Sequence, residues 1–135
     1  MCGFAGFLRT APDSSRDCSE ALVTRMSMVI QHRGPDDSGV WTDDEAGIAL
    51  AHRRLSIIDV STAGHQPMHS PCGRYVLVFN GEIYNHFALR AELLKAGIDI
   101  SWRGHSDTET LLAGFSVWGV KATLYRAVGM FSCSR

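Results

Sequence analysis

The sequence predicts an α+β fold whose strands pair in an antiparallel manner. Short apolar segments with strand periodicity alternate along the 135 residues with amphipathic segments of helical periodicity. Neither internal repeats nor low-complexity linkers separate these segments. The strongest turn signal is Asn80-Gly81, which directly follows a β-branched and aromatic run. This dipeptide favours a hairpin over the crossover helix that parallel strands require.

The first 35 residues are expected to form a strand and a helix. Residues 3–8 are a short apolar run of the kind that forms a buried strand. Asp17 and Glu20 have the spacing of a capping box, which predicts the start of a helix. The apolar stripe of this helix consists of Leu22, Val23, Met26, Val29 and Ile30. The helix should end near His32, because the Gly-Pro dipeptide at 34–35 cannot continue it.

Three apolar runs occupy the middle of the chain. The first two, residues 48–51 and 55–60, are separated by a basic segment at 52–54. The third, residues 75–79, is rich in β-branched and aromatic side chains and therefore predicts a strand. We expect this strand to stop at the Asn80-Gly81 turn.

The remaining segments predict two helices and one more strand. Asn85 can cap a helix that runs to Gly97. Its apolar face comprises Phe87, Ala91 and Leu94. Residues 98–102 alternate between apolar and polar side chains, as in a half-buried strand. Ser106 and Glu109 form another capping box, which opens the last strongly predicted helix. That helix should bury Leu111, Leu112, Phe115 and Trp118.

Composition limits the class of protein. Apolar residues make up 45% of the chain and charged residues 20%, which is typical of one globular domain. The net charge of −1 suggests neither nucleic acid nor an anionic membrane as a partner. The apolar runs are far too short to span a bilayer, and the N-terminus does not resemble a secretory signal. We therefore expect a cytoplasmic protein.

Cysteine and histidine spacing argues against a metal site. The four cysteines, at 2, 18, 72 and 133, form no Cys-x-x-Cys pair, so neither a disulfide framework nor a zinc site is expected. His65 and His69 are four residues apart, but Pro67 between them excludes a continuous helix.

Cys2 directly follows the initiator methionine. Removal of Met1 would place a thiol and a free α-amine on one residue. A free α-amine has a pKa of about 7.7–8.0 and a free thiol about 8.5, so one residue can supply both a base and a nucleophile near neutral pH. The alternative is a cysteine that stands near the chain start by chance.

Other polar residues lie at the expected ends of strands and helices. In the segment 80–82, the asparagine amide and the glycine N–H could donate to one oxyanion, although the same residues suit a hairpin turn. Arg54 suits either a bound anion or a solvated strand end. Asp107 suits helix capping, or together with Glu82 it could hold an ammonium group. The turn-rich segment 32–39 is expected to be structural.

Five ordered motifs together resemble the class II glutamine amidotransferases, which are N-terminal-nucleophile hydrolases. They are Met-Cys-Gly-Phe-Ala-Gly-Phe at 1–7, His-Arg-Gly-Pro-Asp-Asp-Ser-Gly at 32–39, Arg-Arg-Leu-Ser-Ile-Ile-Asp at 53–59, Phe-Asn-Gly-Glu-Ile-Tyr-Asn-His at 79–86 and Ser-Asp-Thr-Glu at 106–109. The segments 54–59 and 80–85 resemble the asparagine synthetase branch in particular. The resemblance extends to about Phe131.

The resemblance implies a four-layer αββα sandwich of two antiparallel sheets and a role for each matched residue. Cys2 would attack the side-chain amide of L-glutamine and form a thioester, with its own α-amine moving the proton. The oxyanion hole would be formed by the Asn80 side chain and the Gly81 N–H. Arg54 would hold the substrate carboxylate, and Glu82 and Asp107 its ammonium group. The backbone around Ile57 and Ile58 would line the pocket. This half-reaction is expected to need no cofactor and no metal.

The sequence departs from the family after Gly129-Met130-Phe131. We expect an amidotransferase domain at 2–131, incomplete at its C-terminus, and a divergent tail at 132–135. The synthetase domain would be absent, together with its ATP and Mg sites, so ammonia would need an acceptor domain or subunit elsewhere. That partner would amidate aspartate or a related carboxylate. Strands missing from the sandwich would leave unpaired edges and exposed apolar faces. The alternative function is a catalytically silent remnant or a binding subunit.

Overall fold

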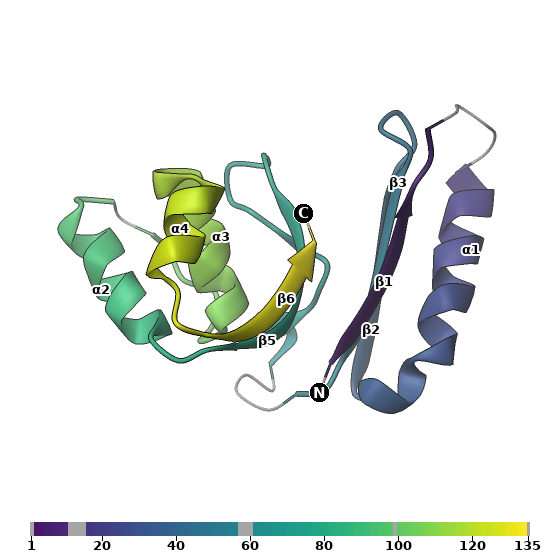
Figure 1. The fold of residues 1–135 in the computed structure, drawn as a ribbon, viewed down its shortest axis with the longest axis horizontal. Helices are drawn as coiled ribbons and strands as arrows, with labels where there is room; N and C mark the ends of the chain where they lie inside the picture. The colour runs from purple at the N-terminus through teal and green to yellow at the C-terminus, as the bar shows by residue number, and fades with distance from the viewer. Residues whose placement is uncertain (1, 11–15, 57–60, 99, 135) are drawn as a thin grey trace. The chain divides into compact units, whose positions relative to one another are not determined.

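The structure, a computed structural model, describes residues 2–10, 16–56, 61–98 and 100–134. The chain divides into two compact units. The first contains Met1–Ser56 and His65–Pro67, and the second contains Ile57–Gly64 and Met68–Arg135. Each unit combines one antiparallel sheet with its own helices, which confirms the predicted α+β class (Figure 1).

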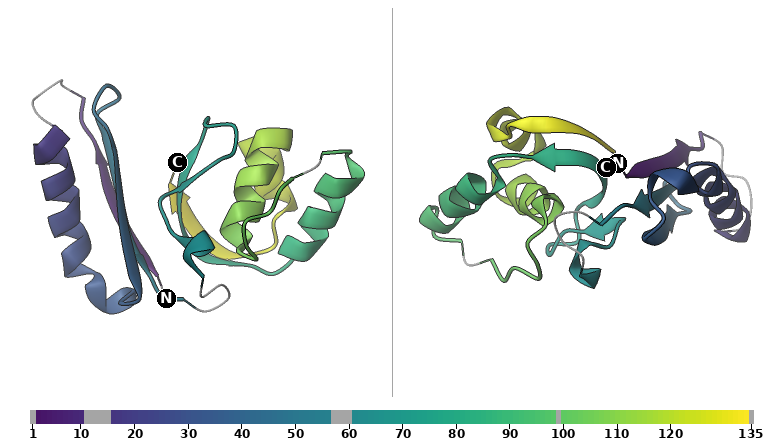
Figure 2. Two further views of the ribbon diagram at one scale, coloured as in Figure 1. Left: turned by 180° about the vertical axis from the view of Figure 1, so that it is seen from behind. Right: turned by 90° about the horizontal axis from the view of Figure 1, so that it is seen from below.

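The first unit is a three-stranded sheet with one helix against it. Its elements are β1 (Gly3–Leu8), α1 (Arg16–Val29), the 3-10 turn η1 (Gln31–Arg33), β2 (Asp37–Asp43) and β3 (Ile48–Arg54). The strand order is β1-β3-β2, so β3 is the central strand and pairs in an antiparallel manner on both sides. Gly3 pairs with Arg53 in β3, and Asp37 pairs with Arg54. Helix α1 covers one face of this sheet (Figure 2).

Helix α1 packs through a different stripe from the one predicted. Its buried residues include Ser19, Val23 and Ser27, which are spaced four apart, whereas Leu22, Met26 and Val29 are exposed. Val23 packs against Ala49 and Ala51 of β3. Small side chains on both elements let the helix approach the sheet closely, and this decides the buried face. The helix also begins at Arg16, so Asp17 lies inside it and not at its N-cap.

The second unit is also a three-stranded sheet, with three helices on one face (Figures 1 and 2). Its elements are the 3-10 turn η2 (Thr62–Gly64), β4 (Met68–His69), β5 (Val76–Ile83), α2 (His86–Lys95), α3 (Asp107–Trp118), α4 (Val120–Arg126) and β6 (Gly129–Ser134). The strand order is β4-β5-β6, and both pairings are antiparallel. The core contains Met68, Leu77, Phe79, Ile83, Leu89, Leu111, Leu112 and Phe115.

The predicted turn at Asn80-Gly81 is wrong, because β5 continues through it to Ile83. Asn80 pairs with Ser132 and Gly81 with Phe131, both in β6. The partner strand comes from about fifty residues further along the chain, and this tertiary pairing overrides the local turn preference. Asn80, Gly81 and Glu82 therefore belong to a strand and not to a loop.

Helix α2 begins after Asn85 as predicted, but it buries the opposite face. Its buried side chains are His86, Leu89 and Leu93, whereas Phe87, Ala91 and Leu94 are exposed. The Asn85 side chain does not cap the helix. Its amide instead donates to the carbonyl of Arg126 (2.9 Å) and accepts the N–H of Val128 (2.8 Å), which fixes the connection that leads into β6.

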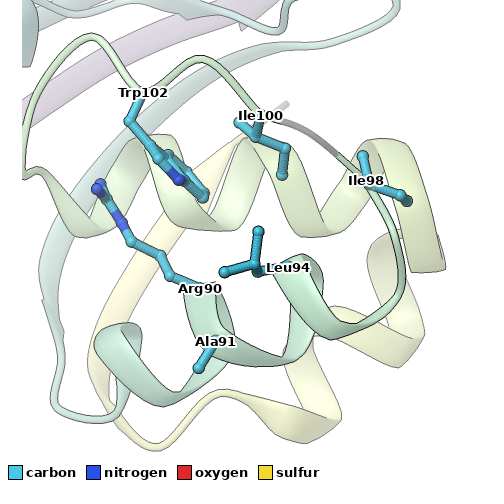
Figure 3. A pocket seen from close by; sticks show the side chains of 6 residues that line it. All are labelled: Arg90, Ala91, Leu94, Ile98, Ile100 and Trp102. Carbon is cyan, nitrogen blue, oxygen red and sulfur yellow. The ribbon is translucent and has the colours of Figure 1, made fainter.

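The alternating segment after α2 is not a strand in the part that the structure describes. Its apolar side chains instead line a cavity of about 180 Å³ against the outer face of α2 (Figure 3). The cavity is lined by Arg90, Ala91, Leu94, Ile98, Ile100 and Trp102. The Arg90 guanidinium lies 3.9 Å from the centre of the Trp102 ring, so stacking on a helix side chain replaces strand pairing.

Helix α3 confirms its predicted cap. The Ser106 hydroxyl accepts the N–H of Glu109 at 3.1 Å. The Glu109 carboxylate does not complete the capping box and instead accepts the N–H groups of Arg103 (2.8 Å) and Gly104 (3.2 Å). Leu111, Leu112 and Phe115 are buried as predicted, and Trp118 is partly buried against the same core.

Candidate active site

The predicted nucleophile, Cys2, lies one residue before β1 and contacts the chain just after β3. Its sulfur accepts the N–H of Leu55 at 3.3 Å and lies 3.5 Å from the Leu55 carbonyl oxygen, to which the thiol can donate. Both contacts are made by the backbone of Leu55, so Leu55 sets the position of the Cys2 sulfur. The sequence carries no signal for such a contact, because every residue offers the same backbone groups.

Cys2 and the predicted carboxylate-binding residue Arg54 lie at the same end of one sheet and on the same face. Because Gly3 pairs with Arg53, Cys2 is one step beyond that pair and next to Arg54. Side chains alternate along a strand, and Arg53 points toward α1, where its Nε donates to the carbonyl of Ser27 at 3.3 Å. Cys2 and Arg54 therefore lie on the face that α1 does not cover. The Arg54 side chain is buried there.

Asn80 and Glu82 share the corresponding face of the second sheet. Phe79 and Ile83 of β5 pack into the core beneath the helices, so the alternate side chains of the strand lie on the face without helices. Asn80 is half-buried and Glu82 is exposed. Cys2 and Arg54 in the first unit, and Asn80 and Glu82 in the second, thus lie on the sheet face that the unit's own helices leave uncovered.

The Gly81 N–H points to the edge of β5 opposite β6. Tyr84 donates its N–H to the carbonyl of Val128, which leads into β6, at 2.8 Å. The direction of the backbone N–H groups alternates along a strand, so the N–H groups of Gly81 and Ile83 point away from β6. The Ile83 N–H confirms this direction by donating to Asp107 at 2.9 Å. β4 pairs only with Val76 and Leu77, and this leaves the Gly81 N–H without a ladder partner on that edge among the described residues.

Asp107, at the start of α3, lies on the same edge of β5. One carboxylate oxygen accepts the Ile83 N–H, and the other accepts the Thr108 N–H at 2.8 Å. Burial raises the pKa of the Asp107 carboxyl, and these two N–H groups oppose the shift. A carboxylate offers about four acceptor positions, so two backbone bonds leave capacity for an ammonium group.

His86 is a neighbour of this carboxylate that no sequence motif singled out for a role of its own. It opens α2 and is buried, and its Nδ1 has no hydrogen-bond partner in the described part of the chain. Burial lowers the pKa of His86, whereas the charge of Asp107 raises it. No sequence pattern distinguishes a buried histidine at the first position of a helix from an exposed one, so the burial of His86 could not be predicted.

The cavity beside α2 contains none of the predicted site residues (Figure 3). Arg90 is its charged member, and its guanidinium donates to Thr110 (2.8 Å), to the carbonyl of Gly104 (3.0 Å) and to that of Ser106 (2.9 Å). These bonds hold the segment before α3. The cavity therefore offers an apolar surface and one guanidinium whose donors already bind protein groups. Such a lining does not suit hydrolytic chemistry.

Metal sites and membrane spans are both missing from the described ranges. No group of three or more histidine, cysteine, aspartate and glutamate side chains lies where it could hold a metal ion there. None of the helices in the same ranges has both the length and the apolar character that crossing a membrane requires. Ile57 and Ile58, which were expected to line the glutamine pocket, lie outside the described residues.

Cys72 is an exposed thiol that can compete with Cys2 for reagents that do not first bind as glutamine does. The hydroxyls of Ser116 (3.3 Å) and Ser70 (3.4 Å) contact its sulfur and lower the pKa of Cys72 to about 7. Ser70 already accepts the Tyr75 N–H, so its own proton is available for the sulfur. The thiolate is the reactive form of cysteine.

We expect iodoacetamide to modify Cys72 at a rate that is half-maximal near pH 7 and close to its plateau by about pH 8. The reactivity of an ordinary thiol is only half-maximal at about pH 8.5 and still rises above it. Peptide mapping after timed alkylation from pH 5 to 9 measures the profile, and Ser70→Ala should shift it to higher pH. A Cys72 profile with its midpoint near that of an ordinary thiol, about pH 8.5, would contradict the assignment.

Comparison with known proteins agrees with the motifs. Residues 1–134 match the model of the glutamine amidotransferase domain family, and the chain belongs to this family. It is 40% identical over 98% of its length to asparagine synthetase [glutamine-hydrolyzing] 1 of Bacillus subtilis. It is 43% identical over 84% of its length to asparagine synthetase B [glutamine-hydrolyzing] of Escherichia coli, and 36% identical over 89% to amidase chry2 of Gibberella zeae.

The chain spans only about a fifth of the length of these relatives: 20% of the Bacillus protein, 19% of the Escherichia protein and 18% of the Gibberella protein. The matched part includes the strand β6, because the family model extends to residue 134.

Proposed function

We propose that this chain hydrolyses L-glutamine to glutamate and ammonia, with Cys2 as the nucleophile after removal of Met1. The thiol sulfur bonds to the side-chain amide carbon, and the thiol proton passes to the α-amine of Cys2. The carbon–nitrogen bond then breaks, and the α-amine returns the proton to the leaving ammonia. Water attacks the resulting thioester, which releases glutamate and restores the thiol.

The observation that carries this proposal is the match of residues 1–134, which include Cys2, to the amidotransferase family. The other residues act on the same glutamine. The Asn80 amide and the Gly81 N–H stabilise the oxyanion. Arg54 binds the α-carboxylate, and Glu82 and Asp107 bind the α-ammonium group.

We also propose that the ammonia is used by a synthetase domain or subunit, which amidates aspartate or a related carboxylate with ATP. The support is the function that the relatives' names state, since they are glutamine-hydrolysing asparagine synthetases at about 40% identity. The pairing of a glutaminase with an acceptor also explains why ammonia would be produced at all, since hydrolysis alone yields only two free products.

A diazoketone analogue of glutamine tests the nucleophile. We expect it to alkylate Cys2 in protein whose intact mass lacks Met1, and excess glutamine should slow this reaction. Cys18, Cys72 and Cys133 should remain largely unmodified, because the reagent must first bind as glutamine does. Iodoacetamide, which needs no such binding, provides the comparison and should modify Cys72 readily.

Ammonia release measured in parallel completes the test. The Cys2→Ala variant should release no ammonia from glutamine and should take up no diazoketone. Labelling first at another cysteine, or turnover by Cys2→Ala, would remove Cys2 from this role. A cooperatively folded chain that neither binds the reagent nor releases ammonia would instead support the silent-remnant alternative.

A further inference from the structure

The contact between Cys2 and Leu55 needs support from outside the sheet. The β1–β3 ladder ends at the Gly3–Arg53 pair and the β2–β3 ladder at the Asp37–Arg54 pair. Leu55 therefore lies beyond the last strand pair, although its N–H and carbonyl both contact the Cys2 sulfur. Something other than strand pairing must fix the backbone at this position.

Asp36 supplies this support from both sides of Leu55. Its backbone N–H donates to the carbonyl of Arg54 at 3.0 Å. Its carboxylate accepts the N–H of Ser56 at 2.8 Å. Bonds from an N–H to an ionised carboxylate are shorter and stronger than bonds between neutral groups. Asp36 thus brackets Leu55 by holding the residue before it and the residue after it.

Tight packing fixes the segment that leads to Asp36, although Asp36 itself is exposed. Gly34, two residues earlier, is buried against the end of β3, where an added side-chain carbon would overlap the backbone of Arg53. Only glycine allows this approach. Pro35 restricts the intervening backbone. The Gly-Pro-Asp segment, expected to be purely structural, therefore places a carboxylate beside the residue that contacts the nucleophile.

We propose that Asp36 is a positioning residue for glutamine hydrolysis, because it holds the Leu55 backbone that sets the position of the Cys2 sulfur. This inference rests on the proposed role of Cys2 as the nucleophile. Reaction rates depend steeply on the alignment of a nucleophile, and a displacement of about 1 Å can cost about a hundredfold. Glutamine binding does not involve Asp36, so its loss should lower kcat and leave KM nearly unchanged.

The test compares Asp36→Ala with Asp36→Asn and with a matched control, all in the full chain. Asp36→Ala should lower kcat by about tenfold to a hundredfold. Asp36→Asn keeps a side-chain oxygen that can accept the Ser56 N–H, so it should recover most of the activity. The control is Asp43→Ala, because Asp43 likewise accepts a backbone N–H, that of Ala46 at 2.9 Å, at the other end of the same sheet. It should leave kcat unchanged.

Two readouts do not depend on glutamine turnover. Hydrogen exchange of the Leu55 and Ser56 amides should accelerate in Asp36→Ala, and the rate at which iodoacetamide modifies Cys2 should change in a Cys72→Ser background. If the wild type released no ammonia, the proposed function would be wrong. The two readouts would still show whether Asp36 holds Leu55 and the Cys2 sulfur in position. A kcat for Asp36→Ala equal to that of Asp43→Ala, unchanged amide exchange, or an Asp36→Asn variant as impaired as Asp36→Ala would overturn the inference.

Discussion

Replacing Asn80 by alanine should lower kcat for glutamine hydrolysis by about 10²–10³, with KM changed by no more than a few-fold. Negative charge on the amide oxygen develops only as the sulfur attacks, so a donor aimed at that oxygen acts mainly in the transition state. Asn80 is half-buried on the helix-free face of β5, where its truncation leaves the core intact.

Asn80→Asp is the decisive companion variant. The carboxylate has almost the size of the amide but cannot donate a hydrogen bond when ionised, and its charge repels the oxyanion. We therefore expect an activity no higher than that of Asn80→Ala. Substantial activity in Asn80→Asp would show that Asn80 contributes by its shape and not by donating to the oxyanion.

Arg54→Ala provides the contrast. Arg54 would hold the α-carboxylate equally in the ground state and in the transition state, so its loss should mainly raise KM. Arg54→Lys keeps the positive charge but loses the bidentate geometry of the guanidinium. Its KM should therefore lie between that of the wild type and that of Arg54→Ala. Thermal unfolding of both variants is needed because Arg54 is buried. A raised KM for Asn80→Ala together with a lowered kcat for Arg54→Ala would mean that the two roles are exchanged.

Local signals in the sequence were sufficient where the structure is decided locally. The apolar run at 3–8 is β1 with the same limits, and Ser106 caps α3 with the predicted side-chain contact. A cap depends on a residue and its neighbours three positions away, and a strand of this length depends on a continuous run. Both can be recognised without knowledge of the partner elements.

Faces and pairings were less predictable because distant elements decide them. In α2, both Phe87-Ala91-Leu94 and Leu89-Leu93 have helical spacing, and only the position of α3 selects the second set. Asn80-Gly81 does favour a turn, but β6 pairs with this segment, and no local sequence pattern predicts that pairing. Tertiary contacts of this kind override propensity wherever two local solutions are close in energy.

In the candidate site, too, some features could be predicted from the sequence, whereas others depend on contacts between distant segments. The motifs identified the residue types, and the register then explains why Cys2 shares a sheet face with Arg54 and why Asn80 shares one with Glu82. The support of Cys2 by Leu55 and Asp36 could not be predicted, because its critical groups are backbone N–H and carbonyl groups beyond the end of a strand. In the sequence, Asp36 is one polar residue of a turn-rich segment that also matches a family motif, and neither observation gives it a role.

Replacing Gly81 by alanine should destabilise the second unit more than the same replacement at Gly73 or Gly97. The backbone at Gly81 has φ of +156°, which side-chain-bearing residues rarely adopt, and an added Cβ would overlap the backbone of Met130 and Phe131 in β6. Backbone strain and overpacking each cost about 1–3 kcal/mol, so we expect a loss of about 2–6 kcal/mol in the free energy of unfolding. The melting temperature should fall by roughly 10 °C or more.

Gly73→Ala and Gly97→Ala separate the two causes. Both glycines also have positive φ, 70° and 77°, but nothing lies within 4 Å of the position of an added Cβ. They should lose only the backbone contribution, about 1–2 kcal/mol. Hydrogen exchange should show faster opening of the β5–β6 amides in Gly81→Ala alone. Equal melting temperatures for Gly81→Ala and Gly97→Ala would mean that β6 does not pack against β5 at this position. The pairing of Asn80 with Ser132 would then have to be abandoned, and with it the direction assigned to the Gly81 N–H.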